Sequence, residues 1–167
     1  MKQFKYILSV FFVLMLMAES QAQYKAFKFV TKKNNGQVLT IQNNQLVALA
    51  TNTKVGNTST QQFFMKRLAN GNVIIANVAY PELCIMRSGT TISLSNPGSG
   101  STSNYEWRLD FAGNDLYLIT NPSNTTQALM IQGNGVIKMA TVATFASGNA
   151  NQNDSYRFEL VSEDNRF

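Results

Sequence analysis

The chain has 167 residues, a formal net charge of +5, no histidine and a single cysteine. The missing histidine excludes Ser-His-Asp and Cys-His nucleophile arrangements and removes the commonest metal ligand. The single cysteine excludes a disulfide within the chain, so a folded domain depends on its core for stability.

The chain opens with the features of a secretory signal peptide. Two lysines precede an apolar run from residue 7 to 18, and small residues, Ser20 and Ala22, stand at the −3 and −1 positions of a cut after Ala22. A transmembrane anchor is the alternative, but the run is about a dozen residues long and a spanning helix needs roughly 20. We therefore expect residues 1–22 to be removed, residues 23–167 to form one domain, and the protein to be secreted or periplasmic.

The rest of the chain contains three similar units, because apolar pairs with one residue between them recur roughly every 45 residues. The pairs that we align are Leu39/Ile41 with Leu83/Ile85 and Leu129/Ile131, Val47/Leu49 with Ile92/Leu94 and Ile137/Met139, and Phe63/Met65 with Trp107/Leu109 and Phe158/Leu160. Residues that tolerate positive φ separate the first pair from the second in each unit: Asn43-Asn44, Ser88-Gly89 and Gly133-Asn134-Gly135. Alternating apolar pairs around such turns predict β-hairpins.

Each unit therefore has about four short strands, and none of them can bury its apolar face alone. The three units are expected to share one core, in which Phe63, Trp107 and Phe158 meet near a threefold axis. The longest polar segments, residues 95–104 and 141–154, are predicted to be surface loops.

This order of elements resembles the ricin-B-type β-trefoil family, which has three repeats of four strands each. The family pattern begins with an apolar-x-Asn element, continues with a Leu-x-Val/Ile strand and ends at Gln-x-Trp. The first element is matched by Ile75-Ala76-Asn77 and Ile119-Thr120-Asn121, and more weakly by Phe29-Val30-Thr31. The last is matched by Gln61-Gln62-Phe63, Tyr105-Glu106-Trp107 and Tyr156-Arg157-Phe158. The resemblance covers residues 24–162 and implies an all-β fold, a β-trefoil of three four-stranded repeats preceded by a cleaved signal peptide.

The sugar-binding residues of the family are only partly matched. In its sugar-binding repeats an aspartate sits within the Leu-x-Ile strand, where this chain has Thr40, Cys84 and Met130, none of them a carboxylate. The first repeat keeps more polar residues at the family's sugar-binding positions than the other two repeats. The resemblance therefore implies that Thr40, Thr60 and Gln61 bind carbohydrate. The alternative for Gln61 is a structural side chain that bonds its own backbone.

Nothing in the sequence predicts catalysis. The carboxylates are scattered, and Cys84 has only Arg87 as a basic neighbour, which favours an inert thiol over a nucleophile. The positive charges form no long basic run. We expect a carbohydrate-binding module that is not an enzyme, with no cofactor, no metal, no nucleic-acid partner and no membrane span. Its partner is a glycan or cell-surface polysaccharide.

The alternative is a secreted protein-binding β-trefoil, such as a protease inhibitor or an adhesion factor. Either long polar segment, residues 95–104 or 141–154, would supply the contact loop, with Phe145 as an exposed anchor. The glycine and serine content of the first segment speaks against an inhibitor, because inhibitor loops gain affinity from rigidity.

The signal peptide is tested by the intact mass of the secreted protein. We expect the loss of residues 1–22, because Ser20 and Ala22 give the small side chains that cleavage needs. Ala22→Arg should block the cut, since it places a large charged side chain at the −1 position. Secreted wild-type protein that keeps the apolar run would contradict the prediction.

Overall fold

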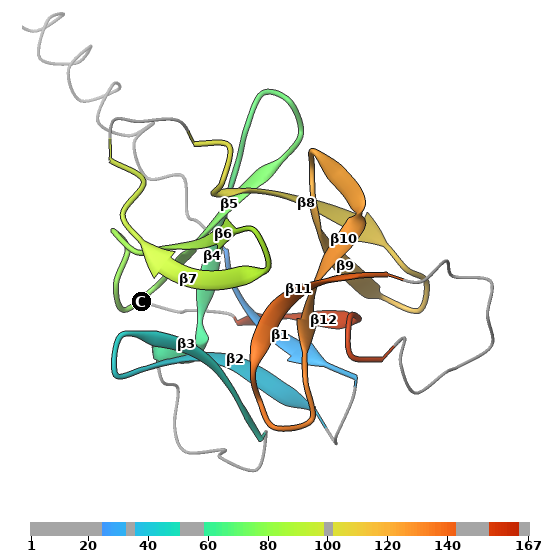
Figure 1. Ribbon diagram of the computed structural model, residues 1–167. Coiled ribbons are helices and arrows are strands. Elements are labelled where there is room, and N and C mark those ends of the chain that lie inside the picture. The colour runs from blue at the N-terminus through green and yellow to red at the C-terminus, as the bar shows by residue number, and fades with distance from the viewer. Residues whose placement is uncertain (1–24, 33–35, 51–58, 99–101, 143–153, 164–167) are drawn as a thin grey trace, which may run out of the picture.

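The computed structural model describes residues 25–32, 36–50, 59–98, 102–142 and 154–163 (Figure 1). The predicted signal peptide lies outside these residues. The described residues form twelve strands and one short 3-10 turn, η1 (Ser59–Gln61). The strands are β1 (Ala26–Thr31), β2 (Gln37–Gln42), β3 (Gln45–Ala50), β4 (Phe63–Arg67), β5 (Val73–Asn77), β6 (Cys84–Ser88), β7 (Thr91–Ser95), β8 (Glu106–Phe111), β9 (Leu116–Asn121), β10 (Asn124–Ile131), β11 (Ile137–Thr141) and β12 (Phe158–Glu163).

Six of the strands close into a barrel, in the order β1, β4, β5, β8, β9, β12 and back to β1, each antiparallel to the next. The other six form three hairpins, β2–β3, β6–β7 and β10–β11. Each third of the chain supplies two barrel strands and one hairpin (Figure 1). The fold is therefore a β-trefoil, and the prediction of an all-β domain with three four-stranded repeats is confirmed. Closure of the barrel leaves its strands without an open edge.

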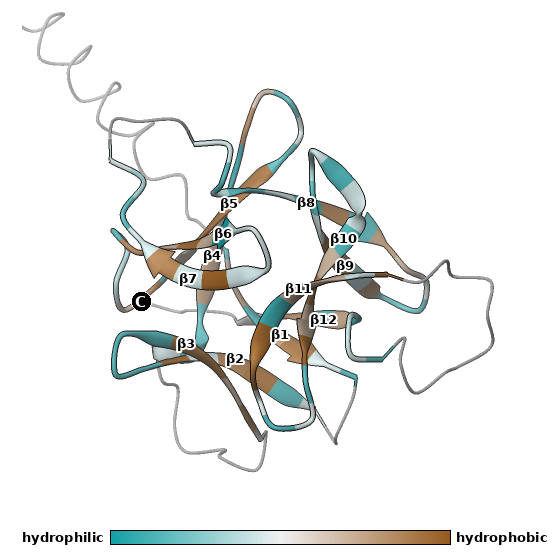
Figure 2. Cartoon of the chain, viewed as in Figure 1, coloured by the Kyte–Doolittle hydropathy of each residue, from teal (hydrophilic) through white to brown (hydrophobic). Residues whose placement is uncertain are grey.

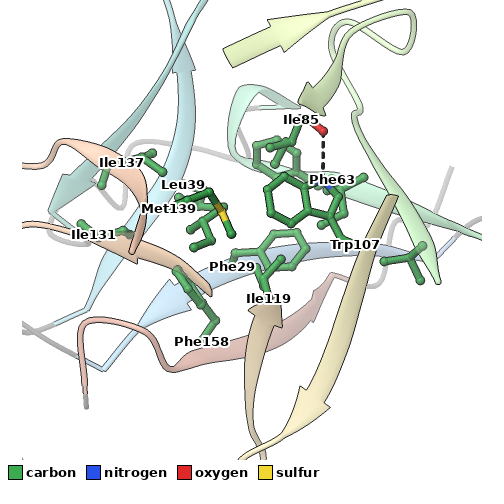
Figure 3. Close-up of a cluster of buried hydrophobic side chains, with 14 of the residues drawn as sticks. Phe29, Leu39, Phe63, Ile85, Trp107, Ile119, Ile131, Ile137, Met139 and Phe158 are labelled. Atoms are coloured by element: carbon green, nitrogen blue, oxygen red, sulfur yellow. Dashed lines mark hydrogen bonds between the residues drawn. The ribbon is translucent and has the colours of Figure 1, made fainter. Parts of the chain in front are cut away.

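The core lies inside the barrel and beneath the hairpins (Figure 3). Phe63, Trp107 and Phe158 are fully buried there, as predicted, and Phe29 packs edge-on against Phe63 with the ring centroids 5.7 Å apart. The indole Nε1 of Trp107 donates a hydrogen bond of 2.9 Å to the carbonyl oxygen of Ile85. Figure 2 shows hydrophobic residues along the strands and hydrophilic ones at the turns, as a shared interior requires.

The repeat register in the second unit differs from our alignment. The pairings set Val30 opposite Val38, Ala76 opposite Cys84 and Thr120 opposite Ala128. The next residues, Leu39, Ile85 and Leu129, are thus equivalent, and all three are fully buried. Leu83, predicted to correspond to Leu39, lies before β6, so that alignment was wrong by two residues. The cause is the strand period of two, which makes Leu83/Ile85 look like the pair that begins at Ile85.

A second correction concerns β3. Leu46 and Ala48 pack on the core, whereas we predicted Val47 and Leu49 for this role. Residues 46–49 are all apolar, so alternation alone does not distinguish the two faces of this strand.

The corrected register exposes one break in the threefold symmetry. Ile41, Arg87 and Ile131 occupy equivalent positions on β2, β6 and β10, because each lies two residues beyond the buried Leu39, Ile85 or Leu129. Ile41 and Ile131 belong to the hydrophobic core. The second repeat thus has an arginine where the other two have a core isoleucine.

The turns follow the predicted chemistry. Asn43 and Asn44, between β2 and β3, have φ values of 52° and 58°, and Gly89, between β6 and β7, has a φ of 58°. Residues 99–101 of the first predicted loop and residues 143–153, the larger part of the second, lie outside the described residues, as does Phe145. Over the described ranges, no helix is long and apolar enough to cross a membrane.

Truncation of Trp107 tests this core. Trp107→Ala should lower the free energy of unfolding by about 3–5 kcal/mol, because it leaves a cavity and an unpaired carbonyl at Ile85. Phe111→Ala is the control, since Phe111 is 67% exposed and its loss should change the free energy by only about 0.5 kcal/mol. Chemical denaturation followed by circular dichroism measures both. Equal effects of the two substitutions would contradict the placement of Trp107.

Candidate functional site

The predicted sugar-binding residues lie side by side in the first repeat, where β2 packs against η1. Thr40 is 5% exposed, and its hydroxyl donates a hydrogen bond of 3.1 Å to the carbonyl of Val38. Gln61 is 9% exposed. Thr60 is half-buried, and its carbonyl accepts a bond of 3.1 Å from the side chain of Asn77. Their role in carbohydrate binding stays a prediction, and Thr40 offers little of its hydroxyl to a ligand.

The position of Gln61 is filled by tyrosine in the other repeats. The Tyr105 hydroxyl donates to the carbonyl of Asn96 at 3.1 Å, and the Tyr156 hydroxyl donates to the carbonyl of Thr141 at 3.2 Å. Asn96 and Thr141 are equivalent residues at the ends of β7 and β11. These tyrosines therefore tie the β6–β7 and β10–β11 hairpins to the barrel. Burial raises the pKa of Tyr156.

A polar cleft of about 220 Å³ lies between the second and third repeats. Every side chain that lines this inter-repeat cleft carries hydrogen-bonding groups, and the one other lining residue is a glycine. The lining residues are Arg87, Gly89, Ser103, Asn104, Asn121, Ser123 and Gln127. The start of β10, which forms part of the third-repeat wall, is hydrophilic in Figure 2.

Asn121, at the end of β9, organises the third-repeat wall. Its Oδ1 accepts a bond of 3.0 Å from the backbone N–H of Ser123, and its Nδ2 donates to Oε1 of Gln127 at 3.2 Å. The equivalent Asn77 makes the same backbone turn, accepting from Ala79 at 2.9 Å, but is fully buried. Asn121 and Asn77 thus make the same bond to the backbone two residues further on. The side chain of Asn121, however, is half-buried and lines a cleft.

Arg87 forms the second-repeat wall and is 6% exposed. Its two terminal nitrogens donate to the carbonyls of Ser103 and Glu106, and its guanidinium carbon lies 5.5 Å from the centroid of the Trp107 ring. Burial lowers the pKa of Arg87, and the negative charge of Glu106 acts in the opposite direction. An arginine remains charged in such a setting, so the wall of the cleft carries a positive charge.

The carboxylate of Glu106 is turned toward the β4–β5 turn. Its Oε2 accepts bonds from the side chains of Asn70 at 2.9 Å and Asn72 at 2.8 Å, and its Oε1 accepts from the Thr102 hydroxyl at 3.2 Å. These hydrogen bonds, led by the one from Asn72, lower the pKa of Glu106. Arg87 therefore bonds the main chain of Glu106 while the carboxylate fixes a turn.

A larger hollow of about 730 Å³ lies at the end of the barrel opposite the hairpins. Its lining combines apolar barrel residues, such as Met65 and Leu109, with charged residues at the rim. Arg108 and Asp110 form an ion pair of 2.6 Å there, and the arginine side chain is 53% exposed. The lining of this hollow is partly apolar, whereas every side chain that lines the inter-repeat cleft carries hydrogen-bonding groups. The cleft is thus the better prepared site for a polar ligand.

Neither metal nor thiol chemistry is indicated by the part of the chain that the structure describes. No three histidine, cysteine, aspartate or glutamate residues within that part gather around a common point. Cys84 is buried on β6, and burial raises the pKa of its thiol, which keeps it protonated.

No model of a known protein family matches the sequence, and a comparison with curated protein sequences finds no match. Solved structures match well in fold. The designed three-fold symmetric protein ThreeFoil has 16% identity and a TM-score of 0.61 over 81% of this chain and 97% of its own. An arabinofuranosidase complexed with arabinofuranosyl-α-1,2-xylobiose has 14% identity and a TM-score of 0.67 over 85% of this chain and 32% of its own. A mosquitocidal holotoxin has 16% identity and a TM-score of 0.65, over 84% of this chain and 17% of its own. These likenesses support the β-trefoil fold.

The contacts of Glu106 predict a pH-dependent stability. Folding lowers the pKa of this carboxyl, so its contribution is present above the unfolded pKa of about 4.3 and is lost as pH falls through the lower folded value. Glu106→Gln should lower the denaturation midpoint at about pH 7 and leave it nearly unchanged at about pH 2.

Glu82→Gln is the matched control, because Glu82 is an exposed carboxylate outside this network. It should leave the midpoint unchanged at both pH values. An equal loss for Glu106→Gln at both pH values would mean that the shape of the side chain matters and its charge does not.

Proposed function

We propose that this protein is a secreted, ricin-B-type carbohydrate-binding module without catalytic activity, and that the inter-repeat cleft is its principal glycan site. The observation that carries the proposal is the lining of the cleft, which consists of hydrogen-bonding side chains and one glycine. Sugar hydroxyls both donate and accept hydrogen bonds, and amides and hydroxyls match them in both roles. The cleft is smaller than the roughly 300–1,000 Å³ of drug-sized pockets, which suits a single sugar unit.

The side chains of Asn121 and Arg87 favour binding because neighbouring groups hold them in place before a ligand arrives. Asn121 is fixed by Ser123 and Gln127, and Arg87 by two backbone carbonyls. Side chains that are already ordered lose less conformational entropy on binding. The cleft has no aromatic side chain among its lining residues, so apolar stacking contributes little. We expect dissociation constants from millimolar to high micromolar, about −4 to −6 kcal/mol.

The comparisons support this role by analogy of fold. The arabinofuranosidase, which was solved with a sugar ligand, matches this chain over 32% of its length. A sugar-acting enzyme thus includes a region with the fold of this protein. Fold alone is a weak guide to function, so the lining of the cleft carries the larger part of the proposal.

The first-repeat residues Thr40, Thr60 and Gln61 are a second proposed glycan site. Thr60 is the most accessible of the three, since Thr40 and Gln61 are both buried. This site has fewer groups free to meet a sugar than the cleft, and we expect it to bind more weakly.

The protein-binding alternative is favoured by a different observation. Phe111 is 67% exposed, and its ring packs edge-on against Tyr117 with the centroids 5.7 Å apart. A large exposed aromatic residue held by a neighbour is a suitable anchor for a protein partner.

A titration followed by NMR distinguishes these sites. A glycan-array screen first selects a ligand, which is then added to ¹⁵N-labelled wild type and to two variants, Gln127→Ala and Gln61→Ala. Each variant loses one amide side chain from one proposed site. We expect Gln127→Ala to weaken binding roughly 3- to 10-fold, as the loss of one or two hydrogen bonds implies, and Gln61→Ala to have a smaller effect.

The chemical shifts locate the ligand independently of the variants. Shifts centred on residues 87–89, 103–104 and 121–127 would support the cleft. Shifts that cluster around residues 40–62 would transfer the site to the first repeat. The absence of shifts with every array-positive glycan, together with perturbation of Phe111 by a protein partner, would favour the alternative function.

A further inference from the structure

The arginine in the inter-repeat cleft is unusual for its position. The equivalent residues on β2 and β10, Ile41 and Ile131, are core side chains with 4% and 1% exposure. Burial of a guanidinium costs free energy that burial of an isoleucine does not. Packing alone therefore does not account for Arg87, although its contacts with Trp107 and two carbonyls offset part of that cost.

The charge of Arg87 is not neutralised by a direct partner. The described part of the chain contains no ion pair of this arginine, and the hydrogen bonds of its guanidinium go to carbonyl oxygens. The nearby carboxylate of Glu106 attracts Arg87 electrostatically but forms no ion pair with it, and its hydrogen bonds come from Asn70, Asn72 and Thr102. The Glu106 charge offsets part of the positive charge of Arg87, and the remainder favours an anion in the cleft, because the wall is poorly solvated.

The opposite wall adds donors for the same kind of ligand. The Asn121 amide gives one N–H to Oε1 of Gln127, which leaves the amide nitrogen of Gln127 as a donor toward the cleft. Ser103 and Ser123 place hydroxyl groups along the edge of the cleft. Gly89 has no side chain that could narrow the cleft, and no atom lies within 4 Å of the position that a Cβ would take there.

We propose that the inter-repeat cleft selects glycans with a carboxylate-bearing sugar, of the uronic acid kind, and that Arg87 provides the selectivity. The inference rests on the proposed glycan-binding function and adds the class of sugar. Arg87 is 6% exposed and its terminal nitrogens already bond two carbonyls, so it acts on the carboxylate through the electrostatic attraction of its charge. The amide and hydroxyl groups of the cleft supply the hydrogen bonds. The net charge is +5 for the full chain and +4 after removal of residues 1–22, which carry Lys2, Lys5 and Glu19, and this positive charge favours the approach of an acidic polysaccharide.

The experiment compares three probes that differ only at C6, the carbon outside the sugar ring: glucose, glucuronic acid and the methyl ester of glucuronic acid. Titration of the wild-type protein by NMR should give an affinity for glucuronate about tenfold higher than for the two neutral probes. This preference should shrink as salt is added, because the deciding interaction is between charges.

Two variants assign the preference to Arg87. Arg87→Ile installs the residue of the other two repeats and should abolish the preference while retaining the weak binding of neutral sugars. Arg67→Gln is the control, because it removes the same charge from an exposed position on β4 and should leave the preference intact. If Arg87→Ile does not fold, the comparison of glucuronate with its uncharged ester on the wild type still tests the selectivity for a carboxylate, and shifts of the Arg87 signals on addition of glucuronate but not of the ester test the role of Arg87.

The outcomes separate this inference from the function on which it rests. Equal affinity for the three probes, with shifts at the cleft, would overturn the selectivity and leave glycan binding in place. Loss of the preference in Arg67→Gln would show a general effect of net charge and would overturn the role of Arg87. No binding of any probe or array glycan would contradict both proposals.

Discussion

The burial of one set of large apolar side chains at the centre of the barrel is the constraint on which the rest of the structure depends. Phe63, Trp107 and Phe158 come from three different repeats and meet in one interior. No disulfide joins the repeats, because the chain has one cysteine. No repeat is able to bury these side chains by itself, so the three must close the barrel together. Each hairpin then packs over the core at a fixed register, and the inter-repeat cleft follows from that arrangement.

The candidate site arises where the repeats depart from their common pattern. Arg87 stands in an isoleucine position, and the structure compensates its charge with the Trp107 ring and two backbone carbonyls. Asn121 makes the same local turn as Asn77 but faces a cleft where Asn77 is enclosed. The shared features stabilise the fold, and the deviations place polar groups on facing walls. The core can therefore keep its threefold pattern while the surface differs between the repeats.

The sequence predicted the parts of the fold that depend on large or conformationally special residues. Trp107 and its two phenylalanine equivalents recur at regular spacing, and asparagine or glycine marks the hairpin turns. The register of β6 was mispredicted because Leu83 and Ile85 are both apolar and two residues apart, which matches the period of a strand. The site was missed for the same reason. Only the corrected register shows that Arg87 replaces an isoleucine, and the spacing of Asn121 from Arg87 is set by tertiary pairing that local patterns do not contain.

The central claim is that Arg87 occupies a core position over Trp107 at the wall of the cleft, and the ¹⁵N NMR signals of its guanidinium test this most directly. A buried guanidinium with bonds to two carbonyls should give resolved N–H signals that exchange slowly with water, and these protons should show nuclear Overhauser contacts to the Trp107 ring. Guanidinium signals of Arg87 that exchange as fast as those of an exposed arginine, without contacts to Trp107, would contradict the register, the cleft and the account built on them.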